Sequence, residues 1–339
     1  MKIVVLDGYT ENPGDLSWDA LKELGEVEVY DRTSYEESPL IAERIGDAEI
    51  VVINKTPISK ETMDKCENIK LIAVLATGYN VVDYAYAKEK GIPVVNVPTY
   101  GTQIVGQYAL GLLLEICSHY GHHDECVKEG KWENNPDWCF WDYPMIELYG
   151  KTAGIIGLGR IGRDTASLCT GIGMKVAGYD PFLTKEQIEG MGYEYYANYE
   201  DLLKDCDVIS IHVPLTKETE NMVSAKQLKE MKNTAIIINC SRGGIINEAD
   251  LIEALDSGEI AGAGLDVFVG EEIHPGNPLL DAKNLIFSPH SAAQTREAVI
   301  NMATMCVEGC KAVCAGKKWK LVANPDVYKH EKWKDAEWA

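Results

Sequence analysis

The chain has 339 residues, of which 46% are hydrophobic and 25% charged. This length provides enough apolar surface for two domains of ordinary size and excludes a short peptide-binding module. Asp and Glu number 53 against 32 Lys and Arg, and the formal net charge of −21 counts against nucleic acid as a partner. The richest apolar run, residues 109–114, ends at Glu115 and is too short to span a membrane, so no membrane association is predicted.

The first residues, Met1 to Asp7, indicate a buried strand and not a secretory signal, because a small-residue cleavage site is missing. We therefore expect a cytoplasmic protein. Ten cysteines without a Cys-x-x-Cys pair are typical of reduced thiols. Cys306, Cys310 and Cys314 would share one helix face, and we interpret them as core residues because the nearest histidines lack ligand spacing. The pair His122-His123 is interpreted as a helix end, so no metal site is predicted.

The first hundred residues alternate short apolar runs with segments of helical spacing. The runs are rich in β-branched residues and are bounded by Asp, Gly, Asn or Pro, as in buried parallel strands. The predicted strands are residues 3–6, 50–53, 71–75 and 94–97, and the predicted helices are residues 17–24, 39–46 and 82–90. This alternation predicts an α/β fold.

A second alternating series begins at Lys151, after two segments of different character. Residues 104–120 predict a long, largely buried helix, and the aromatic-rich residues 129–149 are typical of an irregular segment that covers a neighbour or forms an interface. The strands predicted next are residues 152–156, 175–179, 208–212, 235–239, 261–267 and 285–288. Six strands in a βα series predict a doubly wound sheet. Residues 293–315 predict one more helix, and the tail from Lys317 has weak signals of order.

The motif Gly157-Leu158-Gly159-Arg160-Ile161-Gly162 lies between a predicted strand and a predicted helix. In that context, its glycines allow a tight turn and a close approach to a pyrophosphate at the helix N-terminus. Asp180 ends the next strand, where a carboxylate accepts hydrogen bonds from ribose hydroxyls and repels a 2′-phosphate. The pattern predicts a dinucleotide site that prefers NAD to NADP. Asp180 at a turn before Pro181 also has a purely structural explanation.

Three charged or titratable residues each follow a strand of the second series. They are Arg242, Glu271 and His290. Because ligands bind at the carboxyl ends of the strands of an open α/β sheet, we expect these side chains at one edge. A guanidinium can hold a carboxylate, a histidine can move a proton near neutral pH, and a carboxylate beside it fixes its tautomer.

Six motifs in order resemble those of the D-isomer-specific 2-hydroxyacid dehydrogenases. They are Ala76-Thr77-Gly78-Tyr79-Asn80-Val81-Val82-Asp83, the glycine motif, His212-Val213-Pro214-Leu215, Ser241-Arg242-Gly243-Gly244, Gly264-Leu265-Asp266-Val267-Phe268 and Pro289-His290. The resemblance implies two Rossmann-like doubly wound domains. An NAD-binding domain, residues 99–291, would be inserted into a flavodoxin-like substrate-binding domain formed by residues 1–98 and 292–339.

The resemblance also implies roles for individual residues. His290 would be the general acid/base, Glu271 its partner, and Arg242 the anchor of the substrate. Ala76, Thr77, Gly78 and Tyr79 would complete the substrate site through backbone N–H groups. Besides the glycine motif and Asp180, the implied cofactor contacts are His212, Pro214, Cys240, Ser241 and Asp266.

The substrate expected from the resemblance is hydroxypyruvate, which would be reduced to D-glycerate, or the reverse. Glu271 stands where formate dehydrogenases carry glutamine, and residues 138–144 are similar to those of bacterial hydroxypyruvate reductases. No further regulatory domain follows residue 315, which counts against the longer phosphoglycerate dehydrogenases. Glyoxylate, pyruvate and 3-phosphohydroxypyruvate remain alternative substrates, and a non-catalytic NAD(H)-sensing protein remains an alternative of another class. We expect a homodimer through the NAD-binding domain and residues 129–149.

Overall fold

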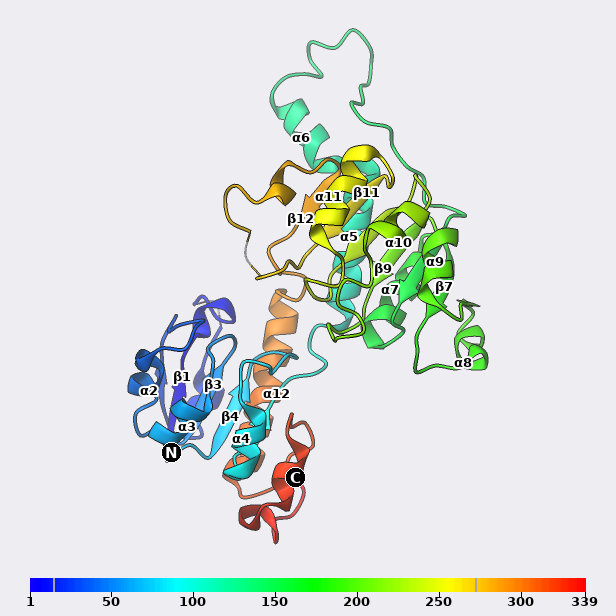
Figure 1. Cartoon of the computed structure of the whole chain (residues 1–339). Helices are drawn as coiled ribbons and strands as arrows, with labels where there is room; N and C mark the ends of the chain where they lie inside the picture. The colour runs from blue at the N-terminus through cyan, green and yellow to red at the C-terminus, as the bar shows by residue number, and fades with distance from the viewer. Residues whose placement is uncertain (15, 272) are drawn as a thin grey trace. The chain divides into compact units, whose positions relative to one another are not determined.

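The computed structural model describes residues 1–14, 16–271 and 273–339 (Figure 1). These fold into two compact units. Unit 1 contains residues 1–100 and 294–339, and unit 2 contains residues 101–293. The chain crosses between the units after residues 100 and 293, whereas the sequence places the crossings after residues 98 and 291.

Unit 1 is built on a five-stranded parallel sheet. Its strands are β1 (Lys2–Val5), β2 (Glu26–Val29), β3 (Ile50–Ile53), β4 (Leu71–Val74) and β5 (Val94–Val95). The order β2-β1-β3-β4-β5 is the flavodoxin-like order. β2 was not predicted, because this edge strand alternates Glu with Val and is largely exposed, so it lacks the apolar run of a central strand.

Alternate residues of each central strand enter different cores. Ile50 and Val52 face α12 (Arg296–Cys314), whereas Val51 and Ile53 face α2 (Pro39–Ile45). The remaining helical elements of unit 1 are η1 (Gly8–Thr10), α1 (Asp19–Lys22), α3 (Lys60–Lys65), α4 (Tyr84–Glu89), η3 (Pro325–Lys329) and η4 (Glu331–Trp333). A sheet covered on both faces explains why its strands read as continuous apolar runs.

The C-terminal tail is ordered, so the prediction of weak order beyond residue 317 was wrong. Val327, Tyr328 and Trp333 are buried in the same core as α12. The Trp333 indole N–H donates to the carbonyl of Gly91 at 2.9 Å, and the Asn324 carboxamide accepts the N–H of Val94 at 2.9 Å. A few buried aromatic residues and one asparagine therefore fasten a segment whose overall polarity indicates disorder.

Unit 2 is built on a seven-stranded parallel sheet. Its strands are β6 (Thr152–Ile156), β7 (Lys175–Tyr179), β8 (Glu194–Tyr195), β9 (Val208–Ile211), β10 (Ile236–Asn239), β11 (Gly262–Leu265) and β12 (Leu285–Phe287). In the order β12-β11-β10-β9-β6-β7-β8, the direction of winding reverses between β6 and β9, as in dinucleotide-binding folds. The predicted fold class is confirmed. The two-residue edge strand β8 was not predicted.

Helices cover both faces of this sheet. The helices of unit 2 are α5 (Thr102–Ser118), α6 (Tyr120–Lys128), α7 (Arg160–Gly171), α8 (Lys185–Gly190), α9 (Tyr199–Asp205), α10 (Ala225–Glu230), α11 (Glu248–Ser257) and η2 (Pro278–Asp281). α5 and α7 share a core on one face, and α9, α10 and α11 share a core on the other. None of the helices of the described residues is long and apolar enough to cross a bilayer.

Candidate active site

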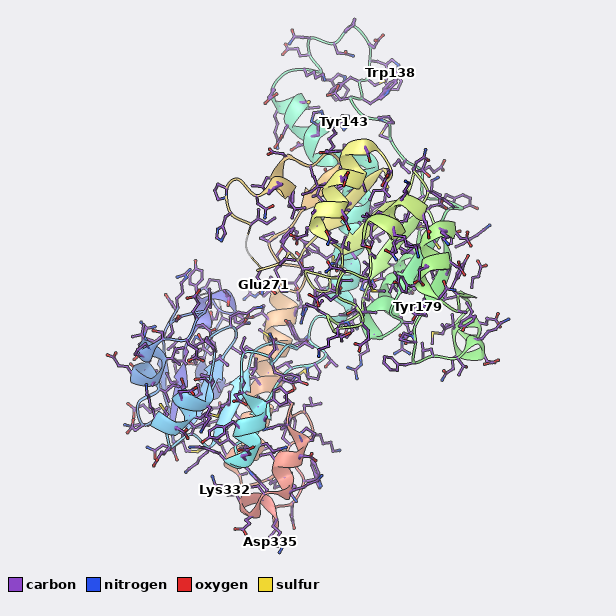
Figure 2. The ribbon with its side chains drawn as sticks, viewed as in Figure 1. Trp138, Tyr143, Tyr179, Glu271, Lys332 and Asp335 are labelled. Carbon is purple, nitrogen blue, oxygen red and sulfur yellow. The ribbon has the colours of Figure 1, made fainter. Side chains whose placement is uncertain are left out.

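His290 and Glu271 form a pair on two loops that follow neighbouring strands. His290 lies just beyond β12 and Glu271 beyond β11, on the loop where Figure 2 labels it. The Nδ1 atom of His290 is hydrogen-bonded to Oε2 of Glu271. Their side chains are 33% and 48% exposed, so the pair is accessible to a ligand. Both residues have a positive φ, 53° and 68°, which is uncommon for residues other than glycine and recurs at functional sites.

Asp266 holds the loop that carries His290. Its carboxylate, 1% exposed, accepts the hydroxyl of Ser288 and the N–H groups of Ser291 at 2.9 Å and Ala292 at 3.1 Å. The N–H of His290 donates to the Asp266 carbonyl at 2.9 Å. Both oxygens of this implied cofactor contact are therefore already used to fix the backbone around His290.

Tyr108 of α5 is a site residue that sequence reasoning missed. Its hydroxyl lies 2.6 Å from the Ser288 hydroxyl and 3.1 Å from the Ser291 hydroxyl. The three hydroxyls and the Asp266 carboxylate thus form one network beneath His290. A single tyrosine in a long apolar helix was the available signal, but its partners stand 180 residues further along the chain.

Arg242 lies on a turn that packs against the loop of Glu271. The buried Asn239, at the end of β10, accepts the N–H of Ser241 at 3.0 Å and donates to the Arg242 carbonyl at 2.9 Å. A Cβ on Gly243 would lie 2.0 Å from the carbonyl oxygen of Phe268, so this turn and the strand end at residue 268 touch through backbone. The pKa of the neighbouring Cys240 thiol is raised, mainly by burial and to a smaller extent by the negative charge of Asp266.

The glycine motif has the geometry of an anion site. Gly157, with φ of 92°, would carry a Cβ 2.7 Å from the carbonyl of His212, and a Cβ on Gly162 would lie 1.9 Å from the carbonyl of Gly157. A Cβ on Gly159, by contrast, would meet no atom within 4 Å. Gly159 is the N-cap of the 12-residue α7, and among the described residues no side chain caps that helix. The open N-terminus with the surrounding close packing fits a dinucleotide pyrophosphate.

The other implied cofactor contacts surround this loop. The Asp180 carboxylate, just after β7, accepts the N–H groups of Leu158 at 2.8 Å and Phe182 at 2.9 Å. Burial lowers the pKa of His212 to about 4, so its imidazole is neutral near pH 7 and its Nε2 pairs with the Ser210 hydroxyl at 2.8 Å. The Pro214 carbonyl accepts the Thr219 hydroxyl at 2.6 Å.

The loop after β4 in unit 1 presents free backbone donors. The Asn54 carboxamide donates to the Leu75 carbonyl at 2.8 Å, and the Ala76 carbonyl accepts the N–H of Val97 at 3.0 Å. Within the described ranges, no protein group accepts the N–H groups of residues 77–79. A loop fixed through its carbonyls, with its donors unused, is suited to bind a carboxylate.

Two buried acids lie beside this loop. The Asp7 carboxylate, 2% exposed, accepts the N–H groups of Asn54 at 2.8 Å, Lys55 at 2.6 Å and Thr56 at 2.7 Å. Glu11 accepts the Asn54 carboxamide. Burial, together with the charge of Asp7, raises the pKa of Glu11 to about 7. This cluster could not be predicted from local spacing, because Asn54 is more than forty residues from both acids.

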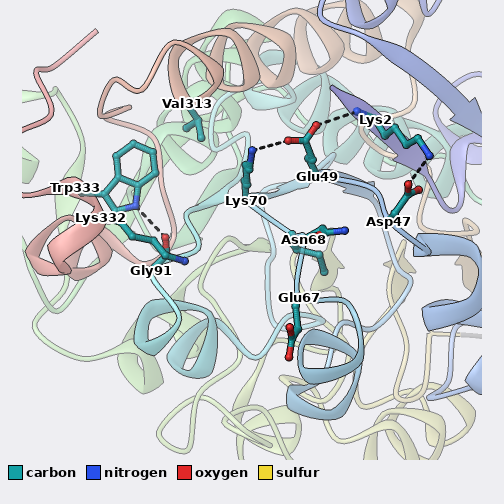
Figure 3. A pocket seen from close by; sticks show the side chains of 11 residues that line it. Lys2, Asp47, Glu49, Glu67, Asn68, Lys70, Gly91, Val313, Lys332 and Trp333 are labelled. Atoms are coloured by element: carbon teal, nitrogen blue, oxygen red, sulfur yellow. Dashed lines mark hydrogen bonds and ion pairs between the residues drawn. The ribbon is translucent and has the colours of Figure 1, made fainter.

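A pocket lies at the opposite end of the unit 1 sheet, where its strands begin (Figure 3). Lys2 pairs with Asp47, and Lys70 pairs with Glu49 at 2.5 Å. Since these lysines already have carboxylate partners, the pocket has little capacity to attract an anionic substrate. The candidate site is at the carboxyl ends of the strands.

Comparison with known proteins identifies the family of this chain. The model of the D-isomer-specific 2-hydroxyacid dehydrogenase NAD-binding domain matches residues 110–292. The chain is 52% identical over 326 residues to a hydroxypyruvate reductase of Blautia hydrogenotrophica, with 95% of this chain and 99% of that protein covered. It is 40% identical over 284 residues to a glycerate dehydrogenase of Methylorubrum extorquens, with 83% and 88% covered.

Solved structures show the same architecture. The D-lactate dehydrogenase of Lactobacillus jensenii with NAD⁺ is 30% identical, with a TM-score of 0.76, and the match covers 95% of this chain and 99% of that one. An acyclic imino acid reductase (Bsp5) in complex with NADPH and D-Arg is 28% identical, with a TM-score of 0.79 and coverage of 95% and 99%. The chain therefore belongs to the D-isomer-specific 2-hydroxyacid dehydrogenase family, an NAD-dependent oxidoreductase family, as its motifs predicted.

Proposed function

We propose that this enzyme reduces hydroxypyruvate to D-glycerate, or catalyses the reverse, with His290 as the general acid/base. The hydrogen bond between His290 Nδ1 and Glu271 Oε2 carries the proposal. It holds the imidazole in the tautomer that has Nδ1 protonated and leaves Nε2 for proton exchange with the substrate oxygen. When bound, NADH supplies the hydride, and NAD⁺ accepts it in the reverse direction.

The remaining groups bind and orient the substrate. Arg242 is always charged and presents a fork of donors, so in the proposal it polarises the carbonyl oxygen and holds the carboxylate. Ala76, Thr77, Gly78 and Tyr79 offer the carboxylate their free N–H groups. These cationic and dipolar groups are needed because the chain as a whole, with a net charge of −21, repels an anion.

The cofactor proposed is NAD(H), with NADP(H) disfavoured. The pyrophosphate would bind at Gly157, Gly159, Arg160, Ile161 and Gly162, with further contacts from His212, Pro214, Cys240 and Ser241. Asp266 would act at the nicotinamide end through the loop it anchors. Asp180 would accept the ribose hydroxyls, and its carboxylate, held by two backbone N–H groups, would repel a 2′-phosphate.

The decisive experiment is the loss of NADH absorbance with the purified chain and hydroxypyruvate, glyoxylate, pyruvate, 3-phosphohydroxypyruvate or 2-oxoglutarate, each repeated with NADPH. The proposal expects the highest kcat/KM for hydroxypyruvate with NADH. If another acid has a higher kcat/KM, that acid replaces hydroxypyruvate as the proposed substrate. Tight NADH binding without turnover of any acid would indicate a non-catalytic NAD(H)-sensing protein. Asp180→Ala should reduce the preference for NADH over NADPH, and an unchanged preference would contradict the role of Asp180.

We also propose a homodimer through unit 2 and residues 129–149. Three tryptophans in this segment are exposed, and Trp138 reaches 87% (Figure 2). Large exposed aromatic side chains are enriched at interfaces. Light scattering should give twice the mass of the chain, and Trp138→Ser with Trp141→Ser should shift it toward the monomer. Trp338→Ser removes a tryptophan of unit 1 that is 56% exposed and serves as the control.

A further inference from the structure

Residues 120–149 bring together three potential metal ligands that are not among the residues of the candidate active site. His122 and Cys126 stand four residues apart on one face of α6, and Asp142 returns to them just before Tyr143, which Figure 2 labels. His122 Nε2 lies 2.7 Å from Asp142 Oδ2, and Cys126 Sγ lies 3.5 Å from His122 Nε2 and 3.7 Å from Asp142 Oδ2. The sequence predicts only a helix end at this place.

The spacing of these atoms matches the coordination shell of zinc. With Zn–S near 2.3 Å and Zn–N and Zn–O near 2.1 Å, a tetrahedral site has ligand-to-ligand distances of about 3.4–3.6 Å. The two distances from the Cys126 sulfur, 3.5 and 3.7 Å, each lie about 0.1 Å from the upper end of this range, where a pair that includes sulfur is expected. The distance of 2.7 Å between His122 Nε2 and Asp142 Oδ2 is shorter because these two atoms are hydrogen-bonded. It has to lengthen by roughly 0.7 Å around an ion. A thiolate, an imidazole and a carboxylate together favour zinc over the harder magnesium and calcium.

The neighbours already orient these side chains. The ring of Tyr143 packs against the imidazole of His122, with centroids 4.9 Å apart. The N–H of Asp142 donates to Nε2 of His123 at 3.3 Å. The Lys131 ammonium contacts both carboxylate oxygens of Asp142, so an ion must displace it from Oδ2, while Oδ1 can keep it as a second-shell partner.

We propose that Nε2 of His122, Sγ of Cys126 and Oδ2 of Asp142 bind one zinc ion, with water as the fourth ligand. Binding transfers the thiol proton of Cys126 to solvent, so affinity increases with pH. The ion would fasten Asp142 to α6 across the 16 positions that separate it from Cys126. Such a link would be useful here because Trp132, Trp138 and Trp141 of the closed loop are exposed and provide no core.

Cobalt titration of the full chain under reducing conditions tests the site, because a thiolate ligand gives Co²⁺ a near-ultraviolet charge-transfer band. The native chain should bind one Co²⁺, which zinc displaces, and Cys126→Ser should remove the band. Asp142→Asn, a change of nearly equal size, should weaken binding by more than the roughly 10- to 100-fold that loss of a second-shell partner costs. Cys139→Ser removes another thiol of the same segment and should bind like the native chain.

Limited proteolysis tests whether the ion links Asp142 to α6. At a chain concentration low enough for light scattering to give the monomer mass, so that no partner covers the segment, zinc should slow proteolytic cleavage within residues 129–141. We expect this in the native chain and in Cys139→Ser, but not in Cys126→Ser. A charge-transfer band that persists in Cys126→Ser, or no stoichiometric binding to the native chain, would overturn the site. Equal protection of native chain and Cys126→Ser by zinc would overturn the link.

Discussion

Asp7 of unit 1 and Asp266 of unit 2 occupy similar places, one just beyond β1 and the other just beyond β11. Each is at most 2% exposed, and each accepts backbone N–H groups from the loop after a neighbouring strand. Asp7 holds residues 54–56, next to a loop with free donors, whereas Asp266 holds residues 288–292, which carry a titratable imidazole. Under the proposed function, the same anchor would support substrate binding in one unit and proton transfer in the other.

The comparison also distinguishes the buried acids from the residues proposed to react, by their exposure and their hydrogen-bond partners. Asp7 and Asp266 make nearly all their hydrogen bonds with backbone or hydroxyl groups of their own unit. His290 and Glu271 are one-third to one-half exposed and make their hydrogen bond to each other. The residues expected to meet the substrate are thus the accessible ones, and their geometry depends on acids beneath them that need not touch it.

The largest effect should come from His290→Ala. Loss of the general acid should lower kcat by about 10²- to 10⁴-fold, while NADH binding, measured by fluorescence, stays within a factor of two or so. His274→Ala, an exposed histidine three residues beyond Glu271, is the matched control and should keep native kcat. Near-native turnover of His290→Ala would show that His290 is not the general acid. The proposed difference in role between the Asp7 and Asp266 anchors would then be wrong.

Glu11→Gln should change how the stability of unit 1 depends on pH. Because the pKa of Glu11 is about 7 in the fold and 4.5 ordinarily, the folded chain binds more protons between these values and loses stability as pH rises through them. The variant cannot ionise at this position and lacks this loss. Raising the pH from 4 to 8 should therefore increase its free energy of unfolding, relative to that of the native chain, by at most about 3 kcal/mol. Urea unfolding of both proteins at both pH values measures this difference. If the free energy of unfolding changes equally in the two proteins between pH 4 and pH 8, Glu11 is ionised in the fold without cost.

Asp7→Asn and Asp266→Asn form a matched pair that tests the shared anchor. Each should reduce the free energy of unfolding by about 2 kcal/mol, because buried N–H groups lose a charged acceptor. Asp266→Asn should lower kcat, since it loosens the loop of His290, whereas Asp7→Asn should raise KM with little change in kcat, because carboxylate binding is the same before and in the transition state. Steady-state kinetics with urea unfolding of both variants decides, and equal effects on kcat would contradict the division of roles.

Tyr108→Phe should have the smallest effect. The variant keeps the ring in α5 and removes only the hydroxyl that joins Ser288 and Ser291, which costs about 1 kcal/mol. We expect a several-fold lower kcat with unchanged NADH affinity, measured by initial rates and fluorescence titration. If kcat and stability both match the native chain, the hydroxyl network is not needed to hold His290.

Central strands could be predicted because both of their faces are buried and leave continuous apolar runs. The edge strands β2 and β8 could not, since they bury too little to produce that pattern. Likewise, the glycine motif could be located because its steric demands fall within six consecutive residues. Tyr108, Asp7 and Glu11 act on partners more than forty residues away, and no local spacing records such contacts.

The cluster of His122, Cys126 and Asp142 illustrates the same limit. His122 and Cys126 have the i, i+4 spacing that places two side chains on one helix face, which a search for ligand pairs could have found. Asp142 joins them only because the aromatic segment turns back onto α6. Composition alone predicted that this segment covers a neighbour or forms an interface, and it did not predict which residues of the segment would lie against α6.

The left-handed backbone at His290 and Glu271 has a consequence for how this enzyme can change over generations. Each such residue costs roughly 1–2 kcal/mol that glycine or asparagine would not incur. Random substitution and selection for heat resistance alone would therefore favour those residues at positions 271 and 290. Their retention would then require selection for turnover itself. A thermostable variant obtained without an activity screen should lose the pair first.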